Sequence, residues 1–265
     1  MRLQDCLYKS VCTNKCTSYC ERYVQMNRLL ELSNLPENYQ KPVKIVSVDE
    51  DRPSYIKLAK IKENIEDFVR KGKNLYICSS TCGNAKTSWA VKLMLRYFDR
   101  TWPNSYDLTR GIYVHVPKFL SDLKNFNDPP EYLNRIIEAD LVIWDDIALA
   151  TLTTYEHDRL LQFIDNRMAN NKSNIYTSNV VNSADLIKMV GSRLASRIYS
   201  FSERITFNAG DFRVGGKLEW YNCKHLIIFL RIKFWKIEEK MLFSIFLQTY
   251  GKISVLCLFV ADNNK

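Results

Sequence analysis

The chain has 265 residues, of which 46% are hydrophobic and 25% charged, a composition typical of a folded globular protein that excludes wholesale disorder. The formal net charge is +9, but residues 217–265 contain eight basic and four acidic residues, so the rest of the chain carries about +5 and only weakly indicates a nucleic-acid partner. The first 25 residues are polar and lack the apolar core of a signal peptide. We therefore expect a cytoplasmic protein, in which cysteines are thiols or metal ligands rather than disulfides.

The first segment is rich in cysteine. If the residues after Cys12 are helical, Cys12, Cys16 and Cys20 form a stripe whose ends lie about 12 Å apart, so a metal site that also includes Cys6 requires a break in the helix. The spacing is neither the paired C-x2-C pattern of zinc sites nor a ferredoxin-like run. Structural zinc, an iron–sulfur cluster and free thiols remain the alternatives, and we expect zinc. Two prolines between residues 33 and 44 indicate a linker, which sets off residues 1–40 as a small module.

From about residue 54 to 214, apolar strand-like runs alternate with helical patterns, which predicts an α/β fold with a mainly parallel sheet flanked by helices. The expected helices are 54–70, 87–98, 155–169 and most of 185–199. The expected strands are 75–78, 111–116, 141–144 and 174–177, with a last strand beginning at Phe207.

The stretch SSTCGNAKTSW at residues 79–89 follows the first expected strand. Its Lys86 and Thr87 occupy the last two positions of the phosphate-loop pattern G-x-x-x-x-G-K-[ST], in which backbone N–H groups, the lysine and the hydroxyl hold phosphate and magnesium. Ser80 and Ala85 replace the two glycines of the pattern. A methyl group at Ala85 crowds the phosphate or strains the backbone if that position needs a positive φ. The alternative is a polar turn with a solvated lysine. The expected nucleotide-binding residues are Ser80, Thr81, Cys82, Gly83, Asn84, Ala85, Lys86, Thr87 and Ser88.

Residues 140–148, DLVIWDDIA, form an apolar strand that ends in two aspartates. This pattern is typical of a Walker B strand, in which Asp145 holds Mg²⁺ together with Thr87 and Asp146 orients or deprotonates the attacking water. The alternative is that the two carboxylates only cap a buried strand.

Two further segments add polar groups. SNIYTSN at residues 173–179 is a short strand, after which Asn179 is positioned to contact the γ-phosphate or the water. GSRLASRI at residues 191–198 places Arg193 and Arg197 on one helix face, where they suit an arginine finger that reaches a neighbouring copy. The alternative is a solvated basic face or a nucleic-acid contact.

These four segments, in this order and spacing, resemble the AAA+ ATPases of the bacterial and phage helicase-loader family, the DnaC and DnaI type, over residues 50–214 and most closely the phage members. The resemblance implies a P-loop AAA+ core, here 41–216, that binds ATP and Mg²⁺, self-associates, binds a hexameric replicative helicase and places it on single-stranded DNA. It also implies that Lys86 and Thr87 bind the nucleotide, that Asp145 is the Walker B aspartate and that Asn179 is the sensor residue. Arg197 matches the family's finger, with Arg193 as the alternative.

Family loops read GNGKT, so Ala85 puts ATP turnover in doubt, and Asp146 stands where many AAA+ proteins have glutamate. Two other functions stay open: an IstB-like ATPase that assists transposition, and a catalytically weak adaptor that binds helicase or DNA. Loaders often have a small N-terminal domain that grips the helicase, a role that residues 1–40 match by analogy.

Three remaining features are less specific. Aromatic and basic residues at 92–102 and 115–126 either stack on single-stranded DNA or belong to the core. The three histidines show no ligand spacing. Residues 241–260 have the length of a membrane span, but Gln248, Gly251 and Lys252 interrupt them, so we expect an extension of unknown structure at 217–265 and no membrane partner.

Overall fold

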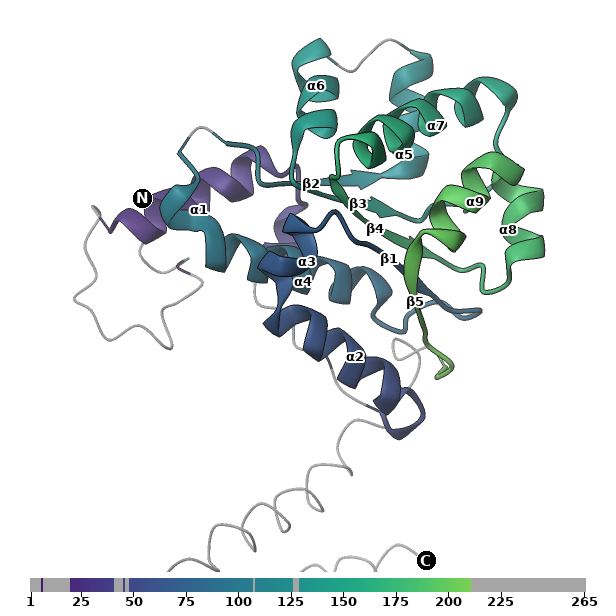
Figure 1. Cartoon of the computed structure of the whole chain (residues 1–265), viewed down its shortest axis with the longest axis horizontal. Helices are drawn as coiled ribbons and strands as arrows, with labels where there is room; N and C mark the ends of the chain where they lie inside the picture. Colours follow the sequence, from purple (N-terminus) through teal and green to yellow (C-terminus); the bar gives the residue numbers. More distant parts are fainter. Residues whose placement is uncertain are drawn as a thin grey trace, which may run out of the picture. The chain divides into compact units, whose positions relative to one another are not determined.

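The computed structural model describes residues 6, 20–40, 45, 48–106, 108–125 and 129–210. Five parallel strands form one sheet in the order β2-β3-β4-β1-β5, with helices on both faces (Figure 1). The strands are β1 (Asn74–Cys78), β2 (Gly111–His115), β3 (Leu141–Asp145), β4 (Ser173–Ser178) and β5 (Ser202–Thr206). The α/β fold with a parallel sheet, predicted from the alternation of strand and helix patterns, is confirmed.

The helices divide between the two faces of the sheet, as Figure 1 shows. One face is covered by α1 (Glu21–Leu32), α2 (Arg52–Glu63), α3 (Ile65–Arg70) and α4 (Lys86–Thr101). The other is covered by α5 (Val116–Lys124), α6 (Pro130–Glu138), α7 (Thr154–Ala169), α8 (Ser183–Val190) and α9 (Ser192–Ser200). Short 3-10 turns occur at η2 (Glu37–Tyr39), η3 (Asp49–Asp51) and η4 (Trp102–Asn104).

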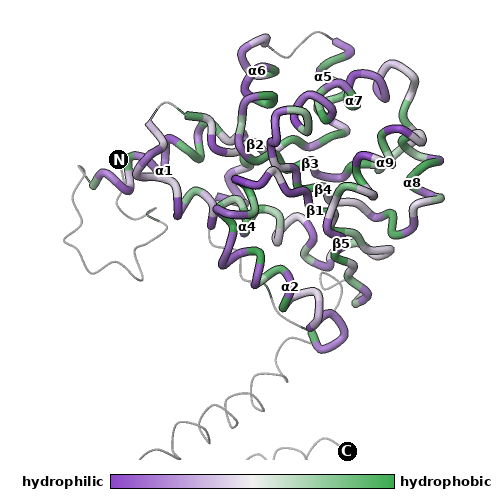
Figure 2. Tube along the Cα trace, in the orientation of Figure 1, coloured by the Kyte–Doolittle hydropathy of each residue, from purple (hydrophilic) through white to green (hydrophobic). Residues whose placement is uncertain are grey.

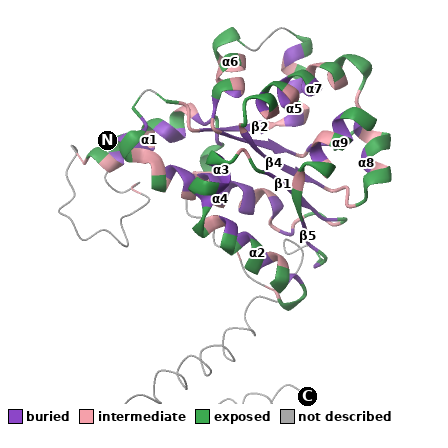
Figure 3. Cartoon of the chain, viewed as in Figure 1, coloured by how far each residue is buried: buried purple, intermediate pink, exposed green. Residues whose placement is uncertain are grey.

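Side chains alternate between two hydrophobic cores because successive residues of a strand point to opposite faces. Leu75 and Ile77 of β1 pack under α2 to α4, whereas Tyr76 and Cys78 pack under the helices of the other face. All five residues of β1 and of β3 are buried, so the sheet is the purple centre of Figure 3, and exposed residues lie on the outer sides of the helices. In Figure 2 the helices carry both hydrophobic residues, in green, and hydrophilic residues, in purple. Burial on both faces explains why these strands appear as continuous apolar runs.

Several element boundaries differ from those predicted. The expected helix 54–70 is two helices, because the chain leaves helical geometry at Asn64 (φ −110°, ψ 30°). The expected helix 185–199 is likewise interrupted at Gly191, whose φ of +78° favours glycine. The prediction that a strand begins at Phe207 was wrong: β5 ends at Thr206, and Phe207 is buried against α2 through a ring contact with Tyr55.

Residues 20–40 pack on the sheet. Met26 and Leu29 of α1 lie in the same hydrophobic core as α4, and Leu35, inside the stretch expected to be a linker, is 4% exposed. Ser33 accepts a hydrogen bond from the Tyr113 N–H at 2.8 Å, so this segment covers the edge strand β2. The hydrophobic core therefore begins before the boundary expected near residue 40.

A buried arginine makes hydrogen bonds at the amino end of β4. Arg167 of α7 has no exposed surface and donates to the backbone carbonyls of Ile136, Ala139 and Ser173 and to the side chain of Asn174, at 2.6–2.7 Å. Burial lowers its pKa to about 9. The guanidinium thus satisfies carbonyls at the end of α6 and at the start of β4, so it joins α7 to both of these segments.

Candidate nucleotide site

The phosphate-loop sequence lies at the carboxyl end of β1, an inner strand of the sheet next to the edge strand β5. β1 is held between β4 and β5, with the Ser79 N–H donating to the Ser178 carbonyl at 3.2 Å and the Phe207 N–H donating to the Cys78 carbonyl at 2.9 Å. The loop then runs directly into α4, which begins at Lys86. In a helix the first N–H groups have no intrahelical acceptor, so they point at whatever lies before the helix, and the helix dipole favours an anion there.

Ala85 is the residue just before α4 and has φ +67° and ψ +19°, the left-handed region. This is the conformation that the sequence identified as unfavourable for alanine, since a Cβ atom there approaches the following carbonyl. Gly83 also has a positive φ, +72°, which costs glycine nothing. The loop thus keeps a backbone path that normally requires glycine while carrying a methyl group at its last turn.

Lys86 lies almost buried inside the loop. Its Nζ donates to the Thr81 carbonyl at 2.8 Å and to Oδ1 of Asn84 at 3.0 Å, and its exposed fraction is 7%. Asn84 is held in turn, because its amide donates to the hydroxyls of Ser79 and Thr81. The ammonium group is therefore held within the loop by Thr81 and Asn84.

Asp145, at the end of β3, is the hub of the polar network. Its Oδ1 accepts from the hydroxyls of Thr87 at 2.8 Å and Thr177 at 2.6 Å, and its Oδ2 accepts from the Tyr113 hydroxyl at 2.6 Å. Burial, and then the Asp145 carboxylate, raise the pKa of Tyr113 far above its ordinary value, so its hydroxyl stays protonated and donates. The structure thus brings Thr87 and Asp145 together, which are 58 residues apart in sequence.

The pair of Thr87 and Asp145 fits a magnesium ion by its chemistry. One hydroxyl oxygen and one carboxylate oxygen, side by side below a loop built for phosphate, match the all-oxygen ligand set that Mg²⁺ prefers, with phosphate oxygens and water completing the octahedron. These two residues would hold the ion, and the ion would neutralise phosphate charge. The hydroxyls of Thr177 and Tyr113 hold the two oxygens of the carboxylate, Thr177 at Oδ1 and Tyr113 at Oδ2.

Asp146, the predicted catalytic carboxylate, is turned away from Asp145. It has φ +57°, and its N–H donates to the Thr177 hydroxyl at 3.0 Å, so the two adjacent carboxylates leave the strand in different directions. Its Oδ2 lies 3.7 Å from Nε2 of His115, at the end of the neighbouring strand β2. The sequence assigned no role to His115, and only the register of β2 against β3 brings it there.

Asn179, the predicted sensor residue, directly follows β4, which lies between β1 and β3. Its amide nitrogen is 3.8 Å from the Cys82 sulfur, a weak contact that places it beside the loop. Of the other expected loop residues, Thr81 donates through its hydroxyl to the Ala209 carbonyl at 2.9 Å, and Ser80 is exposed. Asn179 and the loop therefore border the same space above the carboxyl ends of three strands.

The two arginines of α9 lie apart from this network. Arg197 is half-buried, donates through Nε to Asp165 of α7 at 2.5 Å and packs over the Phe201 ring. Arg193 is exposed. In the described part of the chain, no hydrogen bond or ion pair joins either guanidinium to the phosphate loop.

Two further predictions concern the aromatic residues expected to contact DNA and the cysteines expected to bind a metal. In 92–102 and 115–126, the rings of Tyr97, Phe98 and Phe119 are at most 5% exposed, so these aromatics belong to the core and present no face for base stacking. Cys6 and Cys20 are free and half-buried, and Cys20 occupies the N-cap position of α1 without a side-chain capping hydrogen bond, whereas Cys12 and Cys16 lie outside the described residues. Among the residues that are described, no cluster of three or more metal-ligating side chains is found.

The tail at 217–265 also lies outside the described residues. Within the described ranges, none of the helices combines the length and the apolar character that crossing a bilayer requires.

Sequence reasoning missed three residues of this site. Tyr113 and Thr177 occupy positions that look like ordinary strand residues, and His115 looked isolated. For Thr177 and His115 a signal was present, since both lie at or near the end of an expected strand and parallel strands end at the same edge of a sheet. Tyr113 is the third residue of β2 and gave no such signal. The partners of all three residues, however, follow from the order β2-β3-β4-β1, which the sequence does not state.

A phosphate-loop sequence after β1, an aspartate at the end of β3 and the strand β4 between β1 and β3, in a sheet ordered β2-β3-β4-β1-β5, are the arrangement of a P-loop AAA+ fold. Solved structures with this fold are similar to the chain. The crystal structure of the DnaC helicase loader has a TM-score of 0.52 at 18% identity, covering 68% of this chain and 98% of that one. The DnaI structure has a TM-score of 0.54 at 21% identity, covering 69% and 98%.

The replication initiator DnaA bound to AMPPCP and single-stranded DNA is also similar, with a TM-score of 0.50 at 18% identity, covering 81% of this chain and 63% of that one. The sequence itself matches no protein-family model and no curated protein. The similarity at this level of identity establishes the fold. The AAA+ fold expected from the resemblance is confirmed.

Proposed function

We propose that this chain is an ATP-binding helicase loader, which binds a hexameric replicative helicase and helps to place it on single-stranded DNA in phage replication. The observation that carries the proposal is the cluster of Lys86, Thr87 and Asp145 at the carboxyl edge of the sheet, on a fold like that of the DnaC and DnaI structures. The similarity of the fold to helicase-loader structures supports the loader role, and the cluster of three residues supports the binding of ATP and Mg²⁺.

The chemistry proposed for the site is slow ATP hydrolysis. Lys86 and the first N–H groups of α4 would hold the phosphates, and Thr87 with Asp145 would hold magnesium. Asp146 would orient the attacking water, Asn179 would contact the γ-phosphate, and Arg197 of a neighbouring copy would stabilise the charge that develops in the transition state. A slow reaction suffices for a loader, since assembly that depends on the bound nucleotide acts as a switch.

A second candidate is an adaptor that binds nucleotide without turnover. The strained Ala85 and the bonds of Lys86 to Thr81 and Asn84 favour it, because a phosphate must displace these contacts and meet a methyl group at the turn. The two candidates share the nucleotide-binding step and differ in hydrolysis.

The test of the shared step is ATP binding by the full chain and by Lys86→Ala, measured by calorimetry with Mg²⁺. We expect Lys86→Ala to weaken ATP binding at least about tenfold, since it removes a charge-assisted bond to phosphate. A control is Lys188→Ala, on α8 and paired with Asp185, which should bind as the parent does. Equal affinity of Lys86→Ala and the parent would refute the site.

The test of the loader role is co-purification with the replicative helicase of the same host or phage, with and without ATP. Loader function predicts retention of the helicase that depends on ATP, and phosphate release separates the loader from the silent adaptor. The cysteine segment has its own measurement: zinc content of the full chain against a variant with Cys12→Ser and Cys16→Ser. Zinc near one equivalent in the parent and none in the variant supports a structural zinc in residues 1–40.

A further inference from the structure

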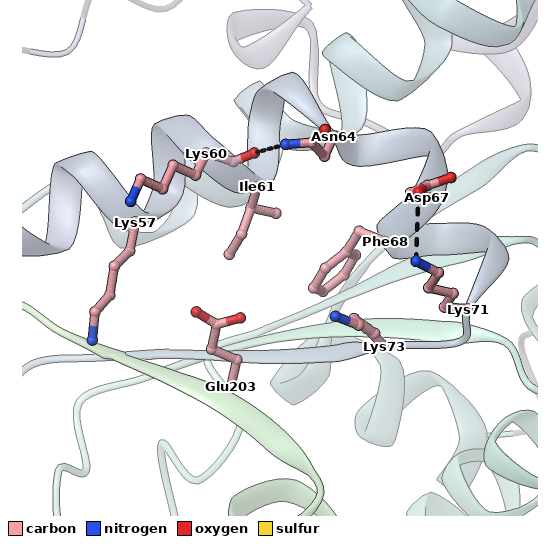
Figure 4. Close-up of a pocket in the computed structure, with 9 residues that line it drawn as sticks. All are labelled: Lys57, Lys60, Ile61, Asn64, Asp67, Phe68, Lys71, Lys73 and Glu203. Atoms are coloured by element: carbon pink, nitrogen blue, oxygen red, sulfur yellow. Dashed lines mark hydrogen bonds and ion pairs between the residues drawn. The ribbon is translucent and has the colours of Figure 1, made fainter.

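A lysine-lined pocket lies at the opposite edge of the sheet from the nucleotide site. It has a volume of about 350 Å³ and is formed by α2, α3 and the amino ends of β1 and β5 (Figure 4). Its lining residues are Lys57, Lys60, Ile61, Asn64, Asp67, Phe68, Lys71, Lys73 and Glu203. Because β1 runs its full length between this pocket and the phosphate loop, about 15 Å of sheet separates the two.

The lysines come from two places that the fold brings together. Lys57 and Lys60 lie on one face of α2 with Ile61 and Asn64, at the spacing i, i+3, i+4 and i+7. Lys71 and Lys73 come from the turn between α3 and β1.

The pocket carries an excess of positive charge, because its lining has four lysines and only two carboxylates, Asp67 and Glu203. Lys71 is 3.5 Å from Asp67, which Arg70 also contacts. Lys57, Lys60 and Lys73 are exposed, and no carboxylate of the described residues lies within 4.0 Å of any of them. By contrast, each acidic residue of α2 and α3 has a basic neighbour, since Glu63 faces Arg96 and Lys62, and Glu66 faces Arg100. The excess charge therefore gathers at the pocket rather than along the helices.

The centre of the pocket is apolar with one carboxylate. Figure 4 shows Ile61 and Phe68 pointing from α2 and α3 toward Glu203 of β5, with Lys57 and Lys73 on either side of that carboxylate. A polyphosphate backbone would meet Glu203 at the middle of the site, and no exposed aromatic ring lines the pocket for a base to stack on. A peptide, in contrast, can place an apolar side chain at the centre and carboxylates at the rim.

We propose that this pocket, the α2–β5 lysine pocket, docks an acidic segment of a partner protein in which aspartate or glutamate residues flank an apolar side chain. Charge complementarity selects the occupant. The segments of this chain outside the described residues are themselves basic, with three basic and one acidic residue in 1–19 and eight basic and four acidic in 217–265. They do not complement the lysines, and an acidic partner does. The contact leaves the phosphate loop accessible, so the partner and ATP bind together.

The test measures the anisotropy of a fluorescein-labelled heptapeptide, three glutamates on each side of one leucine, against the full chain at low salt. The double variant Lys57→Gln, Lys73→Gln should weaken peptide binding about fivefold or more, as two exposed ion pairs are lost. The control Arg28→Gln, Lys188→Gln removes the same total charge from α1 and α8 and should bind within about twofold of the parent. Equal weakening by both double variants would overturn the pocket in favour of general charge attraction.

A gain of affinity provides the second measurement. Glu203→Gln removes the carboxylate at the pocket centre and should tighten peptide binding about threefold, because the repulsion of glutamates is lost. A peptide in which serine replaces the leucine should bind more weakly. Unchanged affinity in either comparison would contradict the occupant proposed.

Two other occupants are distinguishable. If a labelled oligothymidylate of equal charge loses binding in Lys57→Gln, Lys73→Gln while the peptide does not, the surface binds nucleic acid and the proposal fails. If that variant instead lowers the mass of the chain in light scattering without peptide, the occupant is a second copy. ATP affinity, measured on the same samples, should be unchanged in every variant of the pocket, so a failed nucleotide site is separable from a failed pocket.

Discussion

Replacing Ala85 by glycine tests whether the phosphate loop carries backbone strain. Ala85 has φ +67° and ψ +19°, a conformation that costs an alanine about 1–2 kcal/mol. Glycine adopts it freely, but the greater freedom of glycine in the unfolded chain costs about 0.5–1 kcal/mol. Since Ala85 is only half-buried, the contacts of its methyl group are few. The expected result is a net stabilisation of about 0.5–1 kcal/mol.

The matched control is Ala59→Gly, at an exposed position in the interior of α2. There alanine is in its preferred right-handed conformation, so glycine should destabilise the protein by about 1 kcal/mol. Both variants make the same chemical change and alter the unfolded chain alike. The difference between the two free energies of unfolding, about 1–2 kcal/mol, therefore measures the cost of the left-handed conformation itself.

The assay is urea unfolding of the full chain, with ATP binding measured on the same variants. If Ala85→Gly destabilises the chain as much as Ala59→Gly does, the strain argument is refuted. The ATP measurement addresses crowding separately: Ala85→Gly should lower the Kd for ATP, because the methyl no longer faces the phosphates. A more stable variant with an unchanged Kd would show strain without crowding.

Three further changes test other parts of the chain. Arg197→Ala should leave ATP binding intact and lower the hydrolysis that depends on assembly by about a thousandfold or more, seen as phosphate release across a range of protein concentrations; normal turnover would argue against a finger. Arg167→Met should lower the free energy of unfolding by about 3 kcal/mol or more, because several buried carbonyls lose their donors; a loss below about 1 kcal/mol in urea would contradict this. Asp140→Asn should destabilise the chain at neutral pH: burial opposes ionisation, but hydrogen bonds from Arg110 and Lys172 outweigh it and hold the pKa of Asp140 below 3.8. Because the pKa of Asp140 is lower in the folded protein than in the unfolded chain, its ionisation stabilises the fold when the pH is above the unfolded-state pKa. This stabilisation is lost as the pH falls through the folded-state pKa, so the difference in free energy of unfolding between variant and parent should shrink in acid.

The central strands were predictable because their burial on both faces leaves a mark in the sequence. Leu141 to Trp144 is a continuous apolar run of the kind that a strand covered on both sides shows, and the polar Asp145 then marks the edge of the sheet. The same reasoning identified the loop and the two aspartates. This reasoning uses only the local pattern of residues, and its strand predictions were correct where that pattern matches the environment of the residues in the folded protein.

It failed where a residue's role depends on a distant neighbour. Arg167 looks like an ordinary basic residue near the end of an amphipathic helix, and only the packing of α7 on β4 reveals that backbone carbonyls surround it. The sequence of α1 is polar, and residues 1–40 were predicted to form a separate module. In the structure, Met26 and Leu29 of this helix pack in the same hydrophobic core as α4. In both cases the energy comes from contacts between segments far apart in sequence, which composition and spacing do not record.

The hydrogen bonds around Asp145 show how the site can respond to a ligand without moving the sheet. Its Oδ1 accepts from both Thr87 and Thr177, so the carboxylate can give up the Thr87 hydroxyl to a magnesium ion and remain held by Thr177 and Tyr113. Lys86 offers the complementary step on the loop, exchanging the Thr81 carbonyl for a phosphate oxygen. In the first exchange metal coordination would replace a hydrogen bond to the carboxylate, and in the second one charge-assisted bond of Lys86 would replace another. Ala85 differs from both groups, because no exchange of partners removes its methyl group from the left-handed turn before α4.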